Sequence, residues 1–104
     1  MVCAANKKEA GIVAKFNPNY IAVEPPALIG TGISVTSAKP EIVTDSIKAV
    51  KKVKNIPVVC GAGITNGEDV KKAIKLGTKG ALAASGIVKA RNQESALRDL
   101  VKYL

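Results

Sequence analysis

The chain has 104 residues, enough for one small domain with a modest core, and 47% of them are hydrophobic, which excludes a disordered chain. No apolar run approaches the roughly 18 residues that a membrane span requires, so we expect no contact with a membrane. The formal net charge of +8 permits attraction to phosphate groups, but one Phe and two Tyr are too few to stack bases, so nucleic acid is not an expected partner. The chain has no histidine, which excludes every mechanism that needs an imidazole from this chain.

The first half of the chain alternates twice between a short apolar run and an amphipathic segment. Short apolar runs are typical of buried strands, whereas apolar residues spaced three and four apart indicate a helix. In chain order, the sequence predicts a strand over residues 2–4, a helix over 8–16, a strand over 20–23 and a helix over 40–54. Pro40 suits the first turn of the last of these, where its missing N–H is not needed.

The second half repeats this alternation. It predicts a strand over residues 56–60, a helix between a capping box at Thr65 and Glu68 and a stop at Gly77, a strand over 80–83 and a helix from about residue 92 onward. The third helix would turn Val70, Ala73 and Ile74 inward. Alternating strands and helices predict parallel βαβ units in a single domain over residues 1–104, with a sheet covered on both faces.

Cysteines and lysines suggest no chemistry of their own. Cys3 and Cys60 lie in apolar strand-like runs without metal-ligand spacing, so we expect buried, reduced thiols and a cytoplasmic location. Lysines recur opposite the apolar stripes of two predicted helices, at positions 48, 51, 52 and 54 and at 71, 72 and 75. We interpret both sets as solvated outer faces.

Three of the predicted strands end in unusual residues. Glu24 follows the second strand and precedes Pro25-Pro26 and a loop that reaches Gly32, a layout typical of a base beneath a lid with one stiff and one free hinge. Glycine-rich turns follow the third and fourth strands, at residues 61–63 and 84–86. Such turns expose backbone N–H groups that bind phosphate, and the carboxyl ends of parallel strands share one edge. The residues therefore predict a small phosphorylated ligand, with Glu24 as a candidate base.

Three segments carry a resemblance to a known family: residues 22–32 (A-V-E-P-P-A-L-I-G-T-G), 60–64 (C-G-A-G-I) and 84–86 (A-S-G). In this order and at this spacing they resemble the archaeal branch of triosephosphate isomerase. The resemblance covers essentially the whole chain, but only the second half of that enzyme, from its fifth strand to its eighth helix. It implies an α/β fold of the (β/α)8 barrel type, in which this chain is a half barrel of four parallel βα units.

The resemblance also implies an activity. Glu24 would be the base that moves a proton between two carbons of a triose phosphate through an enediol, as in glycolysis and gluconeogenesis. No metal or other cofactor takes part in that reaction. Residues 27–32 would form the closing lid. The substrate phosphate would be held by backbone groups at Ile29, Gly30, Gly63, Ala84 and Ser85.

Some of the family's features are missing. Its lysine and its electrophilic histidine belong to the first half of the barrel and have no counterpart here, so the chain alone is expected to lack activity. Ala27 stands where the archaeal pattern usually has glutamate, which would remove a charged contact from the lid. Ala81 and Ala83 replace larger aliphatic residues. Because a half barrel leaves two edge strands and apolar surface uncovered, we expect it to pair with its missing half or to self-associate as a homo-oligomer.

Three alternatives remain open. A non-catalytic, self-associating half barrel would at most bind phosphate. A fragment of another phosphate-binding barrel enzyme, such as a sugar-phosphate epimerase, usually draws acids or metal ligands from several strands, whereas here only Glu24 stands at a strand end. Nucleic-acid binding would rest on the net charge alone. A partner chain with an Asn-x-Lys strand and a histidine would favour the isomerase.

Overall fold

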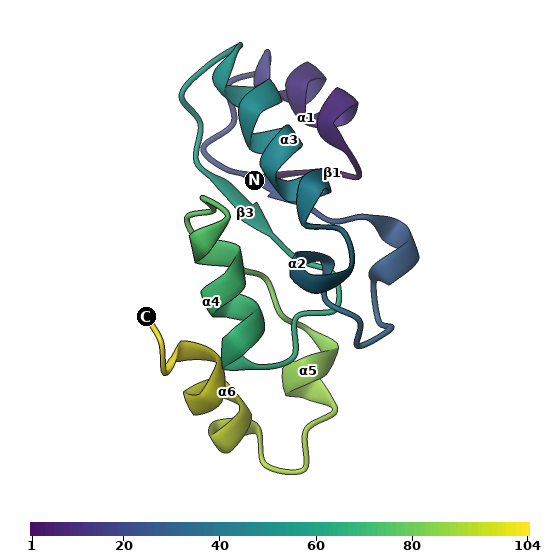
Figure 1. Ribbon diagram of the computed structural model, residues 1–104, viewed down its shortest axis with the longest axis vertical. Coiled ribbons are helices and arrows are strands. Elements are labelled where there is room, and N and C mark those ends of the chain that lie inside the picture. Colours follow the sequence, from purple (N-terminus) through teal and green to yellow (C-terminus); the bar gives the residue numbers. More distant parts are fainter.

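A parallel three-stranded sheet forms the centre of the protein in this computed structural model, which describes residues 1–104 (Figure 1). Its strands are β1 (Val2–Ala4), β2 (Ile21–Val23) and β3 (Val58–Cys60), and they lie side by side in that order. Val2 pairs with Ile21, and Ile21 pairs with Val58. Because consecutive strands are parallel neighbours, each connection crosses over through a helix, which confirms the predicted βαβ arrangement.

Helices pack against this sheet and continue beyond it. Their bounds are α1 (Lys7–Ala14), the 3₁₀ turn η1 (Pro26–Leu28), α2 (Val35–Ala38), α3 (Pro40–Lys51), α4 (Gly67–Lys75), α5 (Ser85–Val88) and α6 (Gln93–Val101). The helix predicted over residues 8–16 ends earlier, because Asn17 has a left-handed backbone (φ 55°) and precedes Pro18. The helix predicted to reach residue 54 ends at Lys51. No helix combines the length and the apolar character that crossing a bilayer requires.

Asparagine side chains cap three of the helices: Asn6, Asn66 and Asn92. The capping box predicted from Thr65 and Glu68 is therefore wrong by one position. Asn66 Oδ1 accepts a hydrogen bond from the Asp69 N–H at 3.0 Å, and Asp69 Oδ2 accepts one from the Thr65 N–H at 3.1 Å. Asn66 takes the position because it has the extended backbone of an N-cap residue, and its short side chain reaches the third helical residue.

The fourth predicted strand is reduced to a single bridge. Ala81 pairs with Cys60 in parallel, and the N–H groups of Lys79 and Leu82 donate to carbonyls of β3, both at 2.8 Å. Residues 80–83 do not form a strand, so that prediction is wrong. The segment has a neighbour on one side only, and Gly80 and Ala81 offer little side chain to pack, which weakens a strand.

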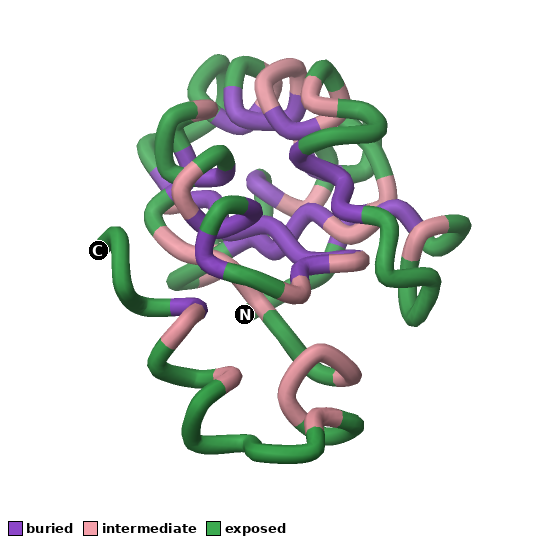
Figure 2. The backbone as a smooth tube through the Cα atoms, turned by 60° about the horizontal axis from the view of Figure 1, so that its bottom comes forward, coloured by how far each residue is buried: buried purple, intermediate pink, exposed green.

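The main core lies between the sheet and helices α1 and α3, where Figure 2 shows the buried residues gathered. Val43, Ile47 and Val50, which lie at helical spacing along one face of α3, are buried in it. A second, smaller cluster joins Ile64, Val70 and Leu100, which brings α4 and α6 together.

Large apolar side chains remain uncovered next to the second cluster. Ile74, predicted to point inward, is 40% exposed, and Leu97, Val101 and Leu104 are 54%, 48% and 76% exposed. All four line a groove of about 290 Å³ between α4, α6 and residues 79–83, which we call the α4–α6 groove. The inward prediction for Ile74 is wrong because no part of the chain covers this side of α4.

Candidate active site

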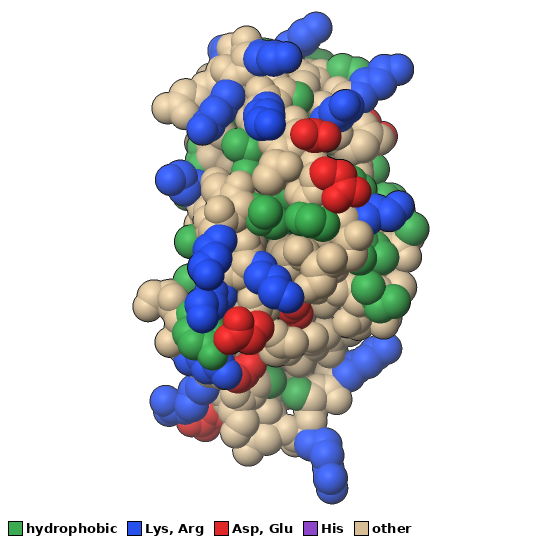
Figure 3. Space-filling model, viewed as in Figure 1, with side chains coloured by type: hydrophobic (Ala, Val, Ile, Leu, Met, Phe, Trp, Pro, Cys, Tyr) green, Lys and Arg blue, Asp and Glu red, His purple; other side chains and the backbone are tan.

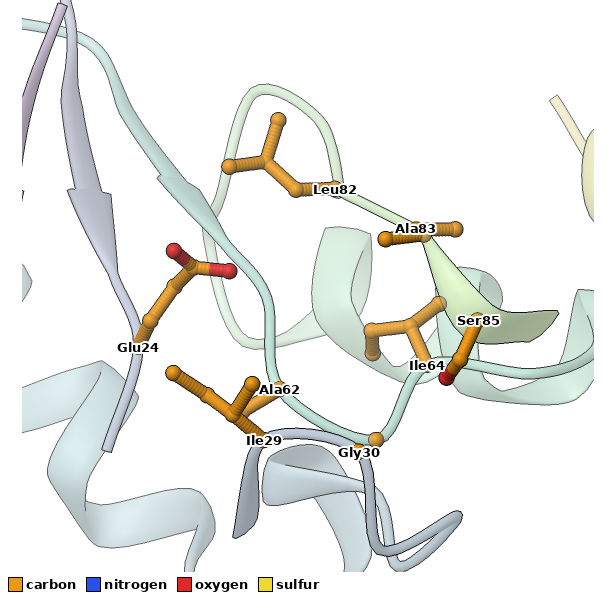
Figure 4. Close-up of a pocket in the computed structure, with 10 residues that line it drawn as sticks. Glu24, Ile29, Gly30, Ala62, Ile64, Leu82, Ala83 and Ser85 are labelled. Carbon is orange, nitrogen blue, oxygen red and sulfur yellow. The ribbon is translucent and has the colours of Figure 1, made fainter. Parts of the chain in front are cut away.

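A cavity of about 300 Å³ lies where β2, β3 and the 79–83 segment end (Figure 4). All six residues assigned to the site from the sequence line this cavity: Glu24, Ile29, Gly30, Gly63, Ala84 and Ser85. The fold thus brings three separate loops together, while the individual roles of these residues remain predictions. The other lining residues, which the sequence reasoning missed, are Ala62, Ile64, Leu82 and Ala83. Their position beside the glycine-containing turns is the signal that could have identified them.

Glu24 follows β2 directly and is half-buried. In Figure 4 its carboxylate points towards β3 and the side of the cavity occupied by Leu82. The Cys3 thiol on the neighbouring strand donates a hydrogen bond to Glu24 Oε2 at 3.7 Å. Gly61 leaves the space for the other oxygen, because a Cβ at position 61 would overlap Oε1. Glu24 is the only charged side chain that lines the cavity.

The turn after β3 has an unusual backbone. Ala62 and Gly63 are both left-handed, with φ of 73° and 71°. An alanine in this region costs about 1–2 kcal/mol, so the surrounding structure must hold it in place. The Ala62 carbonyl accepts a hydrogen bond from the Val35 N–H at 3.1 Å, and Gly63 lies against the Ile33 carbonyl. The turn therefore fixes the far end of the predicted lid.

The predicted lid is a short turn followed by two left-handed glycines. Gly30 and Gly32 have φ of 75° and 73°, which confirms that the loop needs glycine there. Thr31 holds the loop in shape, because its Oγ1 donates to the Leu28 carbonyl at 2.7 Å and accepts from the Ile33 N–H at 3.0 Å. Ile29, at the tip, is 55% exposed.

Free backbone donors surround the cavity. The N–H groups of Gly30, Gly63, Ser85 and Gly86 donate no hydrogen bond within the chain. Ser85 begins the short helix α5. No lysine or arginine lines the cavity, so backbone donors are the groups that an anion would meet there. No group of three or more His, Cys, Asp or Glu side chains lies close enough together to hold a metal ion.

Comparison of the sequence with known protein families identifies the family of this chain. The sequence matches the family model for triosephosphate isomerase over residues 3–104. This chain belongs to the triosephosphate isomerase family.

Two of the curated relatives are archaeal. A triosephosphate isomerase from Methanocaldococcus jannaschii is 53% identical over 105 residues, which cover 100% of this chain and 48% of the relative. One from Methanobrevibacter smithii is 55% identical over 104 residues, which cover 99% of this chain and 47% of the relative. The chain thus spans about half the length of the triosephosphate isomerases it matches.

Solved structures with low sequence identity share the fold. A chain of the Amycolatopsis orientalis BexX/CysO complex superposes with a TM-score of 0.67 at 21% identity, over 95% of this chain and 41% of that chain. A mutant FabK from Thermotoga maritima superposes with a TM-score of 0.61 at 19% identity, over 86% of this chain and 28% of that chain. At such identities the likeness concerns the fold alone.

The two cysteines of this triosephosphate isomerase family member differ in exposure. Cys60 is buried as predicted, but Cys3 is exposed, because β1 is the edge strand of the sheet. Burial, and then the charge of Glu24, raise the pKa of the Cys60 thiol to about 12. Partial burial raises the pKa of the Cys3 thiol too, and the charge and hydrogen bond of Glu24 add to the effect.

This difference predicts selective labelling. At pH 8, iodoacetamide is expected to modify Cys3 first and Cys60 only when the chain unfolds, which mass spectrometry of the peptides measures. Because the folded state holds the Cys60 proton more tightly than the unfolded state, this proton stabilises the fold. The stabilisation is complete below the ordinary thiol pKa of 9.0 and is lost as the pH rises from 9.0 to about 12. In urea both thiols should react alike. Equal rates in the folded chain would contradict the assignment.

Gly63 predicts a large loss of stability on substitution. In Gly63→Ala, the new Cβ would overlap the Ile33 carbonyl at a left-handed backbone, so we expect a loss of about 3 kcal/mol in urea denaturation. Gly30→Ala is the matched control, because Gly30 is also left-handed but has no atom within 4 Å of the added methyl group. It should lose only about 1 kcal/mol. Equal losses would show that Gly63 does not anchor the lid.

Proposed function

We propose that this chain is the C-terminal half of a triosephosphate isomerase, which interconverts dihydroxyacetone phosphate and glyceraldehyde 3-phosphate. The observation that carries the proposal is the single cavity that joins Glu24, the lid and the two glycine-containing turns. A base and an anion site of this kind are what proton transfer on a phosphorylated triose requires. A cytoplasmic location is part of the proposal.

Glu24 acts as the base in this proposal. It takes a proton from the carbon beside the substrate carbonyl and returns it to the neighbouring carbon, with an enediol between the two steps. A solvated carboxylate is a weak base, so the loop over residues 27–32 must close and exclude water. Free N–H groups at Gly30, Gly63 and Ser85 hold the phosphate at the other end of the cavity.

The chain alone is expected to be inactive. Proton abstraction builds negative charge on the carbonyl oxygen, and removing one group that stabilises such charge typically costs on the order of 10²–10³ in rate. The chain contains no histidine, and no lysine lines the cavity. Both groups are expected from the N-terminal half.

The missing half would bind at two edges. The outer edge of β1 has no neighbouring strand, and residues 79–82 pair with β3 on one side only. Beside the second edge lies the α4–α6 groove, whose leucine and valine side chains would each contribute roughly 1–2 kcal/mol if the part that is now exposed became buried. A partner that supplies strands at both edges would satisfy the open backbone groups and cover this groove.

Complementation tests the proposal and the choice of half. The chain is mixed separately with the N-terminal half and with the C-terminal half of the Methanocaldococcus jannaschii relative, and isomerase activity is measured. Activity only with the N-terminal half is expected. Activity only with the C-terminal half would place this chain at the other end of the enzyme. Activity of the chain alone would refute the account of the missing groups.

A second candidate function rests on the uncovered apolar groove. Leu97, Val101 and Leu104 are all about half exposed or more, which suits a non-catalytic half barrel that self-associates and at most binds phosphate. Size-exclusion chromatography with light scattering separates the cases. A stable oligomer that gains no activity from either half of the relative would favour this function. A compact, stable monomer would contradict the self-associating half barrel.

A further inference from the structure

A basic groove of about 520 Å³ lies along the α1–α3 pair and shares no lining residue with the cavity of Glu24. The two helices approach closely, since a Cβ on Gly11 would lie 3.8 Å from that of Ala49. Figure 3 shows basic side chains over the α1–α3 end of the molecule as well as elsewhere on this face. Those at the α1–α3 end are all lysines, because the two arginines, Arg91 and Arg98, lie near the C-terminus. Five lysines line the groove with a single acid, Asp45: Lys7, Lys8, Lys15, Lys48 and Lys52.

These lysines have no partner within the chain. The three ion pairs of the protein all involve other residues, and none of the five donates a side-chain hydrogen bond. Lys48 and Lys52 are one helical turn apart, a rise of about 6 Å. This is less than the Debye length of about 8 Å at physiological salt, so the charges repel one another and together attract an anion.

The floor of the groove is apolar. Ile12 is 47% exposed and Val53 is 37% exposed, and both line the groove with Gly11 and Ala49. A chain of phosphates would cover these side chains without offering them an apolar contact. No aromatic side chain lines the groove, so a nucleic acid would find no surface on which to stack its bases. The floor and the lysines together fit a ligand that is both acidic and apolar.

We propose that this groove binds an acidic amphipathic helix of a partner protein. A third helix packs naturally along two that already touch, with its apolar stripe against Ile12 and Val53. Glutamates four residues apart on that helix rise by about 6 Å, which matches the spacing of Lys48 and Lys52. The net charge of +8 adds long-range attraction for such a partner. The site is independent of the proposed isomerase function.

The test uses the full chain and a fluorescent helical peptide of about 18 residues, composed of leucine, alanine and glutamate, with a glutamine-for-glutamate peptide as its control. Anisotropy is measured at about 50 mM salt, where charge pairs are weakly screened. Removing three groove charges with Lys8→Gln, Lys15→Gln and Lys48→Gln should weaken binding about tenfold. Removing three charges elsewhere with Lys75→Gln, Lys89→Gln and Arg91→Gln should change it less than about twofold. Circular dichroism checks that each variant is folded.

The apolar floor is tested separately. Ile12→Ser removes no charge and should weaken peptide binding about fivefold, because a helix loses its apolar contact there. Equal weakening by the two triple variants would show diffuse attraction and overturn the site. Binding of the glutamine peptide at equal strength would overturn it as well. So would an oligothymidylate that binds at least as tightly as the peptide and is unaffected by Ile12→Ser, since this would indicate a phosphate chain.

Discussion

Glu24→Gln is expected to lower the isomerase kcat/KM of the complemented enzyme by about 10²–10⁴-fold. Glutamine keeps the shape of the side chain but cannot accept the proton. The cavity offers no substitute, because Glu24 is the only charged side chain in its lining. The measurement is steady-state kinetics on the chain mixed with the N-terminal half of the Methanocaldococcus jannaschii relative.

A matched variant controls for the loss of one negative charge. Glu41 is an exposed acid in the first turn of α3, and it does not line the cavity. Glu41→Gln should therefore leave kcat/KM within about twofold of the parent, because an exposed charge outside the site contributes little. If Glu24→Gln behaved like Glu41→Gln, the base would have to lie elsewhere and the proposed mechanism would fail.

Local sequence patterns predicted correctly the features that depend on the backbone preference of a single residue. Pro40 starts α3, and Gly30 and Gly32 are left-handed, because fixed or free φ angles act within one residue. The capping prediction failed more subtly, since Thr65 and Asn66 are both good cap residues and only the path of the incoming chain selects between them.

Non-local surroundings account for the other errors. Apolar residues at 80–83 predict a strand, but with a neighbour on one side only and with Gly80 and Ala81 offering little side chain to pack, the segment forms a single bridge. Ile74 has the spacing of an inward residue, yet nothing covers its side of α4. Cys3 lies in an apolar run, but β1 is an edge, so the thiol remains exposed. In each case the sequence pattern identifies an apolar residue without identifying what covers it.

The candidate site was easier to predict than its surroundings. Parallel strands end at one edge, so a carboxylate after β2 and a glycine-containing turn after β3 must be neighbours once the sheet is parallel. The cavity then follows from topology and from three loops. The spacing of apolar residues could not predict how side chains pack inside the cavity. An example is the space that Gly61 leaves for the Glu24 carboxylate.

Gly61→Ala is expected to damage catalysis without unfolding the chain. The added Cβ would overlap Glu24 Oε1 and lie 2.9 Å and 3.0 Å from Cδ and Cγ of the same side chain. All three atoms belong to a flexible side chain, so the carboxylate can move while the backbone stays. A shift of about 1 Å in a catalytic group can cost about 10²-fold in rate, and we expect a fall of this size in kcat. KM should change little, because the proposed phosphate donors are in other loops or at Gly63.

Gly11→Ala is the control for adding a methyl group. Its Cβ would make an ordinary contact of 3.8 Å with Ala49, and alanine favours a helix over glycine by about 1 kcal/mol. Gly11→Ala should therefore stabilise the chain slightly and leave kcat unchanged. For Gly61→Ala, urea denaturation should show a change below about 1 kcal/mol, since the moved group is a side-chain end. A large loss of stability with an unchanged kcat would mean that Gly61 supports the β3 turn and does not position Glu24.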